Sequence, residues 1–188
     1  MTKTRSAAWG LTLILGGAAG CAGTPAEPPA AAPATGDAVA ASVRQAWQAA
    51  RTNLTGSAEA LTEADYGFRP VDTVRTYGQI LTHIAGANYV FCSAARGEAS
   101  PHAESAFEET VTTREAIIAT LAESLTYCDA AYDAATDVTL AESITLPFGQ
   151  GTGARALALV GNIGHLNEHY GNLVTYMRIR GVVPPSSR

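Results

Sequence analysis

The sequence predicts an all-α protein, a four-helix bundle, and three observations support this fold class. Apolar residues recur at three- and four-residue steps in four separate segments, the spacing of one helix face. Capping and stop residues border several of these segments. No segment gives a confident strand. Four helices with such faces pack as a bundle, in which sites are built from facing helices.

The first predicted helix covers about 37–58. Asp37 is expected to be its N-cap, because a carboxylate there accepts hydrogen bonds from free backbone N–H groups. The helix ends near Gly56. Its apolar stripe consists of Val39, Val43, Trp47 and Leu54.

The second predicted helix covers about 73–96, after Pro70 and Asp72. Arg96 lies in its last turn, and Gly97 is the expected left-handed residue that ends it. Pro101 prevents continuation. The apolar face is formed mainly by Val74, Tyr77, Leu81, Ile84 and Phe91.

The third predicted helix covers about 111–135. It starts near Thr112, and Glu115 follows three residues later in capping-box spacing. The connection 97–110 is long for a simple antiparallel turn, which favours a crossover that makes the second and third helices parallel. The apolar face is formed by Ile117, Ile118, Leu121 and Leu125.

The fourth predicted helix covers about 153–180, with Thr152 as its candidate cap. A basic last turn, Gly181 and then Pro184 end it. The preceding FGQGTG is interpreted as a flexible connection, because it follows no strand and lacks the lysine of a phosphate loop. Residues 138–148 are expected to be irregular or to contain a short extended piece.

The N-terminus has the layout of an export signal. Residues 1–20 combine a basic start, a short apolar run and small residues. Residues 18–21 resemble a bacterial lipobox, which predicts lipidation of Cys21. The alternative is an ordinary signal, cleaved or retained, with Cys21 as a spare thiol. Residues 21–36 then form an Ala/Pro-rich tether, and 37–188 the domain. The predicted location is the cell envelope, with a lipid anchor as the only membrane attachment.

The charge balance argues against nucleic acid as a partner. The chain carries a formal net charge of −5, and removing residues 1–20 takes away two positive charges, giving −7. Phosphate binding needs a basic face, which this domain lacks.

The two cysteines of the domain leave two possibilities. In an oxidising compartment, Cys92 and Cys128 either form a disulfide or remain two buried thiols. If the second and third helices are parallel, both cysteines lie near the C-terminal ends of their helices, which favours the disulfide.

The stretch GHLNEHYGN carries the clearest chemical signal. His165 and His169 are four residues apart, so they share one helix face and can chelate a metal ion, or pack as two core residues. The stretch also matches the inverted zinc-peptidase motif H-x-x-E-H. That motif needs an acidic ligand downstream, and none of the nineteen residues after His169 is acidic, so we exclude it. The surrounding polar ridge consists of Asn162, His165, His169, Asn172 and Tyr176.

A third ligand must come from another helix. His102 follows Pro101 in a linker, and we interpret it as an exposed loop histidine. His83 lies in the middle of the second helix, where it is either a hydrogen-bonded core residue or a ligand. A two-histidine chelate on a facing helix favours the ligand.

Several stretches resemble the DinB/YfiT-like superfamily of four-helix metalloproteins over about residues 40–186. They are YGFRPVDTVRTYGQILTHIAGANYVFCSAARGE, TYCDAAYDA and HLNEHYGNLVTYMRIRGVVPPSS. The resemblance implies up-down-down-up connectivity and a divalent metal held by His83, His165 and His169. Many relatives have glutamine at the position of Asn172.

Three neutral imidazoles leave a divalent ion an open coordination position, the pattern of catalytic rather than structural sites. Such an ion activates water or a thiol against a small-molecule substrate. Zinc is expected first, and nickel, iron or manganese fit the same ligands. The resemblance is compatible with a metal-dependent hydrolase or a thiol-dependent transferase.

The remaining assignments are less specific. Glu168 is a candidate proton carrier or a solvated surface carboxylate. Asn162, Asn172 and Tyr176 either orient ligands or pack as ordinary polar residues. The alternatives to an enzyme are a metal-binding or stress-associated module without turnover, and a structural bundle without metal. A homodimer is compatible with the sequence.

Overall fold

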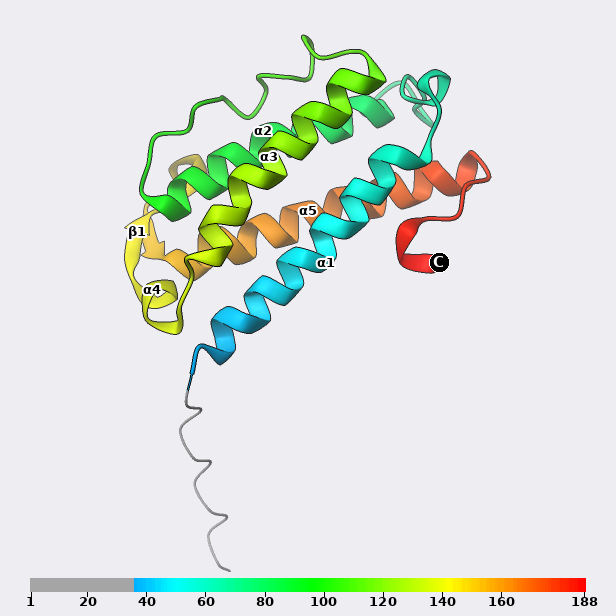
Figure 1. The fold of residues 1–188 in the computed structure, drawn as a ribbon. Coiled ribbons are helices and arrows are strands. Elements are labelled where there is room, and N and C mark those ends of the chain that lie inside the picture. Colours follow the sequence, from blue (N-terminus) through cyan, green and yellow to red (C-terminus); the bar gives the residue numbers. More distant parts are fainter. Residues whose placement is uncertain (1–35) are drawn as a thin grey trace, which may run out of the picture. The chain divides into compact units, whose positions relative to one another are not determined.

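The computed structural model describes residues 36–188 and confirms the all-α prediction. The four long helices are α1 (Ala38–Ala60), α2 (Tyr77–Arg96), α3 (Arg114–Asp133) and α5 (Arg155–Ile179) (Figure 1). The predicted export signal, the lipidation site Cys21 and nearly all of the tether lie outside the described residues. Within 36–188, none of the helices combines the length and the apolarity that crossing a membrane requires.

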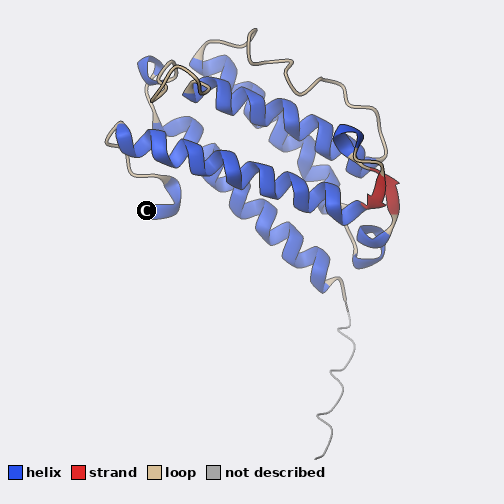
Figure 2. Ribbon diagram, turned by 180° about the vertical axis from the view of Figure 1, so that it is seen from behind, coloured by secondary structure: helices blue, strands red, loops and turns tan. Residues whose placement is uncertain are grey.

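Smaller elements fill the connection between α3 and α5. They are helix α4 (Asp137–Ala141) and strands β1 (Ser143–Thr145) and β2 (Thr152–Ala154), which pair antiparallel with Ile144 opposite Gly153. Figure 2 shows this ribbon at one end of the bundle. Short 3-10 turns occur at Glu63–Asp65, Pro147–Gly149 and Pro185–Ser187. The predicted short extended piece is therefore one strand of a hairpin.

Contacts at the two ends of the helices fix their directions as up-down-down-up. Near their first turns, α2 and α3 meet where Gly78 packs against Ile117, and near their last turns Cys92 bonds to Cys128, so they run parallel. Helix α5 is antiparallel to α2, because Tyr176 near its end bonds to Arg75 just before α2.

Helix α1 is antiparallel to α3. Trp47 in the first half of α1 donates through Nε1 to Asp129 near the end of α3 (2.9 Å). At the other end, Arg114 of α3 donates to the carbonyl oxygen of Leu61 (3.0 Å). Trp47 also stacks on Tyr132, with ring centroids 4.3 Å apart, in the centre of the core.

The helix starts differ from the sequence expectations at three places. Helix α2 begins at Tyr77, because Thr76 and Gln79 form a capping box, and Val74 lies before it, 39% exposed. Helix α3 is capped by Thr113, whose side chain accepts from the Ala116 N–H, and not by Thr112.

The expected cap of the last helix is also wrong. Thr152 pairs with Thr145 in the ribbon, and α5 begins at Arg155 without a side-chain cap. Pairing in the strand commits the backbone of Thr152 to an extended conformation three residues before the helix starts.

Asp37 flanks α1 as predicted, but its side chain does not cap this helix. Its Oδ1 accepts from the Asp137 N–H at the start of α4 (2.9 Å). In return, Asp137 Oδ1 accepts from the Ala40 N–H in the first turn of α1 (2.8 Å). Asp37 thus accepts a hydrogen bond from the start of α4, and Asp137 accepts one from the first turn of α1. Val39, expected on the apolar stripe, is 59% exposed.

The two domain cysteines form a disulfide between α2 and α3. Cys92 and Cys128 are fully buried, and their Cα atoms are 5.3 Å apart. The bond lies between the parallel helices near their C-terminal ends. This is the position expected if the connection 97–110 is a crossover.

The crossover, residues 97–113, runs outside the bundle from the end of α2 to the start of α3 (Figure 1). It begins at Gly97, which has the predicted left-handed conformation (φ 73°). It packs directly on α2 at Gly86, where an added Cβ would collide with the carbonyl oxygen of Glu104. Only glycine at this position permits such a close approach of the two backbones.

Candidate metal centre

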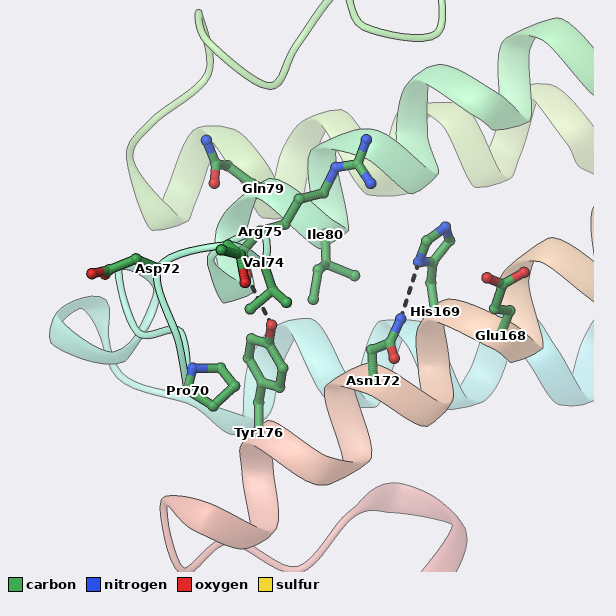
Figure 3. Close-up of a pocket in the computed structure, with 11 residues that line it drawn as sticks. Pro70, Asp72, Val74, Arg75, Gln79, Ile80, Glu168, His169, Asn172 and Tyr176 are labelled. Carbon is green, nitrogen blue, oxygen red and sulfur yellow. Dashed lines mark hydrogen bonds between the residues drawn. The ribbon is translucent and has the colours of Figure 1, made fainter.

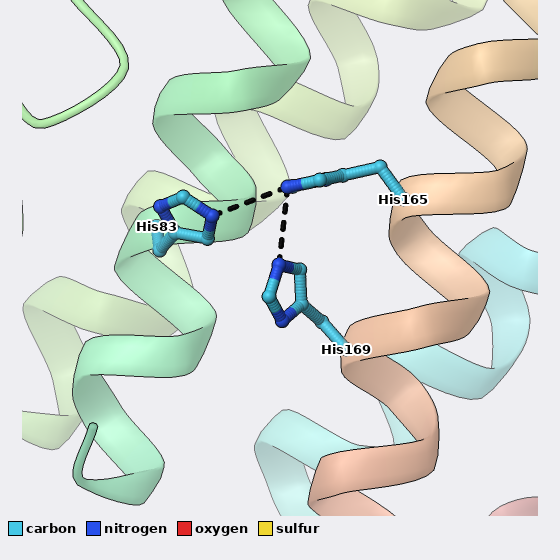
Figure 4. A group of neighbouring side chains, drawn as sticks. All are labelled: His83, His165 and His169. Carbon is cyan, nitrogen blue, oxygen red and sulfur yellow. Dashed lines mark hydrogen bonds between the residues drawn. The ribbon is translucent and has the colours of Figure 1, made fainter. Parts of the chain in front are cut away.

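Three histidines from two antiparallel helices converge inside the bundle (Figure 4). His83 comes from the middle of α2, and His165 and His169 from successive turns of α5. The Nε2 atom of His165 is 3.1 Å from Nε2 of His83 and 3.1 Å from Nε2 of His169. His83 and His169 are buried, with exposed fractions of 6% and 9%, and His165 is partly buried.

The geometry suits a shared cation better than hydrogen bonds alone. An imidazole nitrogen has either one hydrogen or one lone pair in the ring plane. Nε2 of His165 therefore cannot form hydrogen bonds with both neighbours at once. Two nitrogens bound to one tetrahedral zinc ion, at bonds of roughly 2.0–2.1 Å, are about 3.3 Å apart. The two spacings to His165 are close to this value, and all three ligand nitrogens lie within 4.8 Å of one another, so the three residues fit a divalent ion.

The protonation of the α5 histidines also favours metal binding. Burial, followed by the charges of His169 and His83, lowers the pKa of His165 to about 3. Burial likewise lowers the pKa of His169, an effect that the negative charge of Glu168 opposes. A neutral imidazole keeps the lone pair that a metal requires.

Glu108 is a functional candidate that sequence reasoning missed. Its Oε1 is 3.0 Å from Nδ1 of His83, on the side of the ring away from the cluster nitrogen. A carboxylate there fixes the tautomer, because Nδ1 carries the hydrogen and Nε2 keeps the lone pair. Glu108 lies in the irregular crossover, so no periodic pattern relates it to His83 and no sequence signal marks it.

Arg75 holds Glu108 in place. The guanidinium donates from Nε to Oε2 (2.8 Å) and from a terminal nitrogen to Oε1 (3.3 Å). Burial alone would raise the pKa of Glu108, but the hydrogen bond and charge of Arg75, assisted by His83, lower it below its usual value. The Tyr176 hydroxyl in turn donates to the Arg75 carbonyl oxygen (2.9 Å).

The predicted supporting residues have different positions. The amide nitrogen of Asn172 lies 3.5 Å from Nδ1 of His169. With the amide flipped, its oxygen would accept the hydrogen of Nδ1 instead. Tyr176 reaches the site only through Arg75. Nδ1 of His165 is buried and has no hydrogen-bond partner within the part of the chain that the structure describes.

Asn162 does not support the histidines. It is buried beside the disulfide, and its amide nitrogen contacts the Tyr132 hydroxyl (3.2 Å) and the sulfurs of Cys92 (3.6 Å) and Cys128 (3.7 Å). It shares a helix face with His165, but packing one turn earlier surrounds it with the core. The polar ridge on α5 is therefore divided between the core and the histidine cluster.

A cleft of about 680 Å³ opens beside the cluster (Figure 3). Of the three clustered histidines, His169 lines it, so the cleft meets the cluster at this residue. Glu168 also lines it but is exposed, and within residues 36–188 its side chain makes no hydrogen bond or ion pair. The polar lining includes Arg75, Gln79, Glu168, His169, Asn172 and Tyr176.

The structure places the fourth histidine outside the cluster. His102 is exposed in the crossover, where its ring packs against Tyr89 and Phe107 at centroid distances of 4.7 and 5.0 Å. This position agrees with its interpretation as a loop histidine.

The connectivity and the histidine cluster define a class of protein, the four-helix bundles with an internal candidate metal site between the second and the last long helix. The family model of the DinB superfamily matches residues 46–173, more than half of the chain. The chain therefore belongs to the DinB superfamily.

Solved structures share the fold. A DinB-like protein from Bacillus cereus superposes with a TM-score of 0.65 at 21% identity, over 76% of this chain and 93% of that one. A conserved protein from Enterococcus faecalis gives 0.59 at 16% identity, over 74% and 95%. A mycothiol-dependent maleylpyruvate isomerase gives 0.57 at 15% identity, over 71% and 60%. At these identities the likeness establishes the fold. No curated protein matches the sequence.

Proposed function

We propose that the chain is a metal-dependent enzyme of the cell envelope that acts on a small molecule. The observation that carries this proposal is the convergence of three Nε2 atoms beside a solvent-open cleft. The cleft volume of about 680 Å³ is in the range of small-molecule sites, roughly 300–1,000 Å³.

His83, His165 and His169 would hold the ion through Nε2. When bound to three neutral imidazoles, a divalent ion would keep an open coordination position and supply an activated water molecule or thiol there. Zinc is the first expectation, and nickel, iron or manganese suit the same donors. Glu108 holds the His83 ring in the metal-binding tautomer, and Asn172, with its amide oxygen turned toward Nδ1, would do the same for His169.

The reaction is hydrolysis or the transfer of a thiol-linked group. The name of the mycothiol-dependent isomerase with the same fold supports the thiol option. Glu168 on the cleft wall is a weak candidate for carrying protons, because it is exposed and does not contact a histidine nitrogen.

Export of the chain is part of the proposal. It rests on the basic and apolar layout of residues 1–20 and on Cys21 at the end of the lipobox-like stretch. The Cys92–Cys128 disulfide supports it, since such bonds persist mainly in oxidising compartments.

Metal analysis of the protein purified without an affinity tag tests the proposal. We expect a single bound divalent ion per chain, lost in His83→Ala. His102→Ala is the matched control, because it removes a histidine outside the cluster and should keep the ion. Full metal retention by His83→Ala would show that the three-histidine site is wrong.

A second measurement separates an enzyme from a metal-binding module without turnover. In the cobalt-substituted protein, an added small thiol should change the visible absorption spectrum if a coordination position is accessible. An unchanged spectrum at saturating thiol would favour the module.

A further inference from the structure

The crossover places a second carboxylate beside His83. Oε1 of Glu104 is 3.7 Å from Nε2 of His83, the nitrogen that faces the cluster. The Glu104 side chain is 41% exposed, and among residues 36–188 its carboxylate makes no hydrogen bond. Glu104 and Glu108 thus approach different nitrogens of one imidazole. Glu104 is beside the nitrogen that faces the cluster, whereas among the described residues the ligand atoms that all lie within 4.8 Å of one another are those of the three histidines.

The contact between Glu104 and His83 brings electron-rich atoms together. Glu108 accepts from Nδ1, so the neutral His83 ring has no hydrogen on Nε2. The Nε2 lone pair then faces a carboxylate oxygen at 3.7 Å and the Nε2 atom of His165 at 3.1 Å. The carboxylate oxygen and the ring lone pair repel one another in this arrangement unless a positive charge lies between them.

A close contact between two backbone segments fixes the position of Glu104 relative to α2. The carbonyl of Glu104 lies against Gly86, three residues after His83 on the same helix, where a larger residue would collide with it. One turn of helix therefore separates the histidine from the place where the crossover is pressed onto α2. The 41% exposure of the side chain leaves it room to turn toward the cluster.

We propose that Glu104 is a fourth ligand of the ion held by His83, His165 and His169. This inference rests on the proposed metal site and specifies its donor set as three nitrogens and one carboxylate oxygen. The carboxylate lowers the net charge of the loaded site from +2 to +1. A substrate or thiol would then bind the ion either in place of Glu104 or as a fifth ligand.

Metal affinity of the full-length protein tests the assignment. Zn²⁺ affinity is measured by competition with a chelator for wild type, Glu104→Gln and Glu109→Gln. Glu109 lies on the same crossover, is exposed, and makes no ion pair within the described residues, so it controls for the loss of one negative charge. We expect Glu104→Gln to bind Zn²⁺ about 10–100-fold more weakly and the control to bind nearly as wild type.

The cobalt-substituted proteins provide a second readout. Replacing a carboxylate ligand by a neutral group changes the ligand field, so Glu104→Gln should shift the visible bands of bound Co²⁺ while Glu109→Gln leaves them unchanged. If Glu104→Gln matches the wild type in affinity and spectrum, Glu104 does not bind the ion, and the ligand assignment is wrong. If the wild type itself binds no metal, the proposed function fails as a whole.

Discussion

Glu108 determines what His83 is able to do, although it lies on a different segment of the chain. Its carboxylate fixes the hydrogen on Nδ1, and Arg75 holds the carboxylate from the other side. Such partners of metal-binding histidines raise the basicity of the ring and set its orientation. The chain Tyr176, Arg75, Glu108, His83 therefore links the cleft wall to the cluster.

Replacing Glu108 should weaken metal binding without removing a ligand. We expect Glu108→Gln to reduce Zn²⁺ affinity about 10–100-fold, because the amide is a weaker acceptor and frees the ring to adopt the other tautomer. The visible bands of bound Co²⁺ should stay close to those of wild type, since the directly bound atoms are unchanged. Equal Zn²⁺ affinity for Glu108→Gln and Glu109→Gln would contradict this role.

At the scale of the elements, two adjacent threonines show how a cap is chosen. Thr112 and Thr113 both precede α3, but only Thr113 accepts from the N–H of its third helical residue, Ala116. The sequence fits either threonine, and the hydrogen bond in the structure selects the one directly before α3.

The two threonines give a matched pair of variants. Thr113→Ala should reduce the free energy of unfolding by about 1 kcal/mol, because it leaves a backbone N–H of the first turn without its acceptor. Thr112→Ala should change it by less than about 0.5 kcal/mol, the usual effect at an exposed site. Urea denaturation of the metal-free proteins measures both, and a larger loss for Thr112→Ala would assign the cap to the other residue.

For the whole molecule, the disulfide joins two parallel helices across a loop with a sequence separation of 36 residues. Closing a loop of this size in the unfolded chain stabilises the fold by about 4 kcal/mol in the chain-entropy model. The double variant Cys92→Ala/Cys128→Ala should lose on the order of this amount in urea denaturation. A reducing agent should destabilise the wild type and leave the double variant unchanged. Free thiols at both Cys92 and Cys128 in the unreduced, denatured wild type, counted apart from Cys21, would contradict the bond.

Much of the architecture could be predicted because its signals are local. Helix periodicity identified the four long helices, and the spacing of His165 and His169 placed them on one face. His83 was found because a facing pair of histidines makes a third one plausible. The length of the connection after α2 indicated a crossover, and parallel helices followed from it.

The missed features depend on contacts between distant segments. Glu104 and Glu108 meet His83 only because the crossover folds back onto α2 at Gly86. The exchange of caps between Asp37 and Asp137 joins residues a hundred positions apart. Asn162 lies on the expected helix face, but core packing decides that it contacts the disulfide and not the histidines.

The crossover separates the chemistry of this protein from its scaffold. The imidazoles belong to helices that the core holds rigidly, whereas both acidic neighbours of His83 come from an irregular surface segment. Loops tolerate substitutions and insertions that buried helices do not. New reactivity can therefore evolve here through changes in the crossover, while the four long helices stay unchanged.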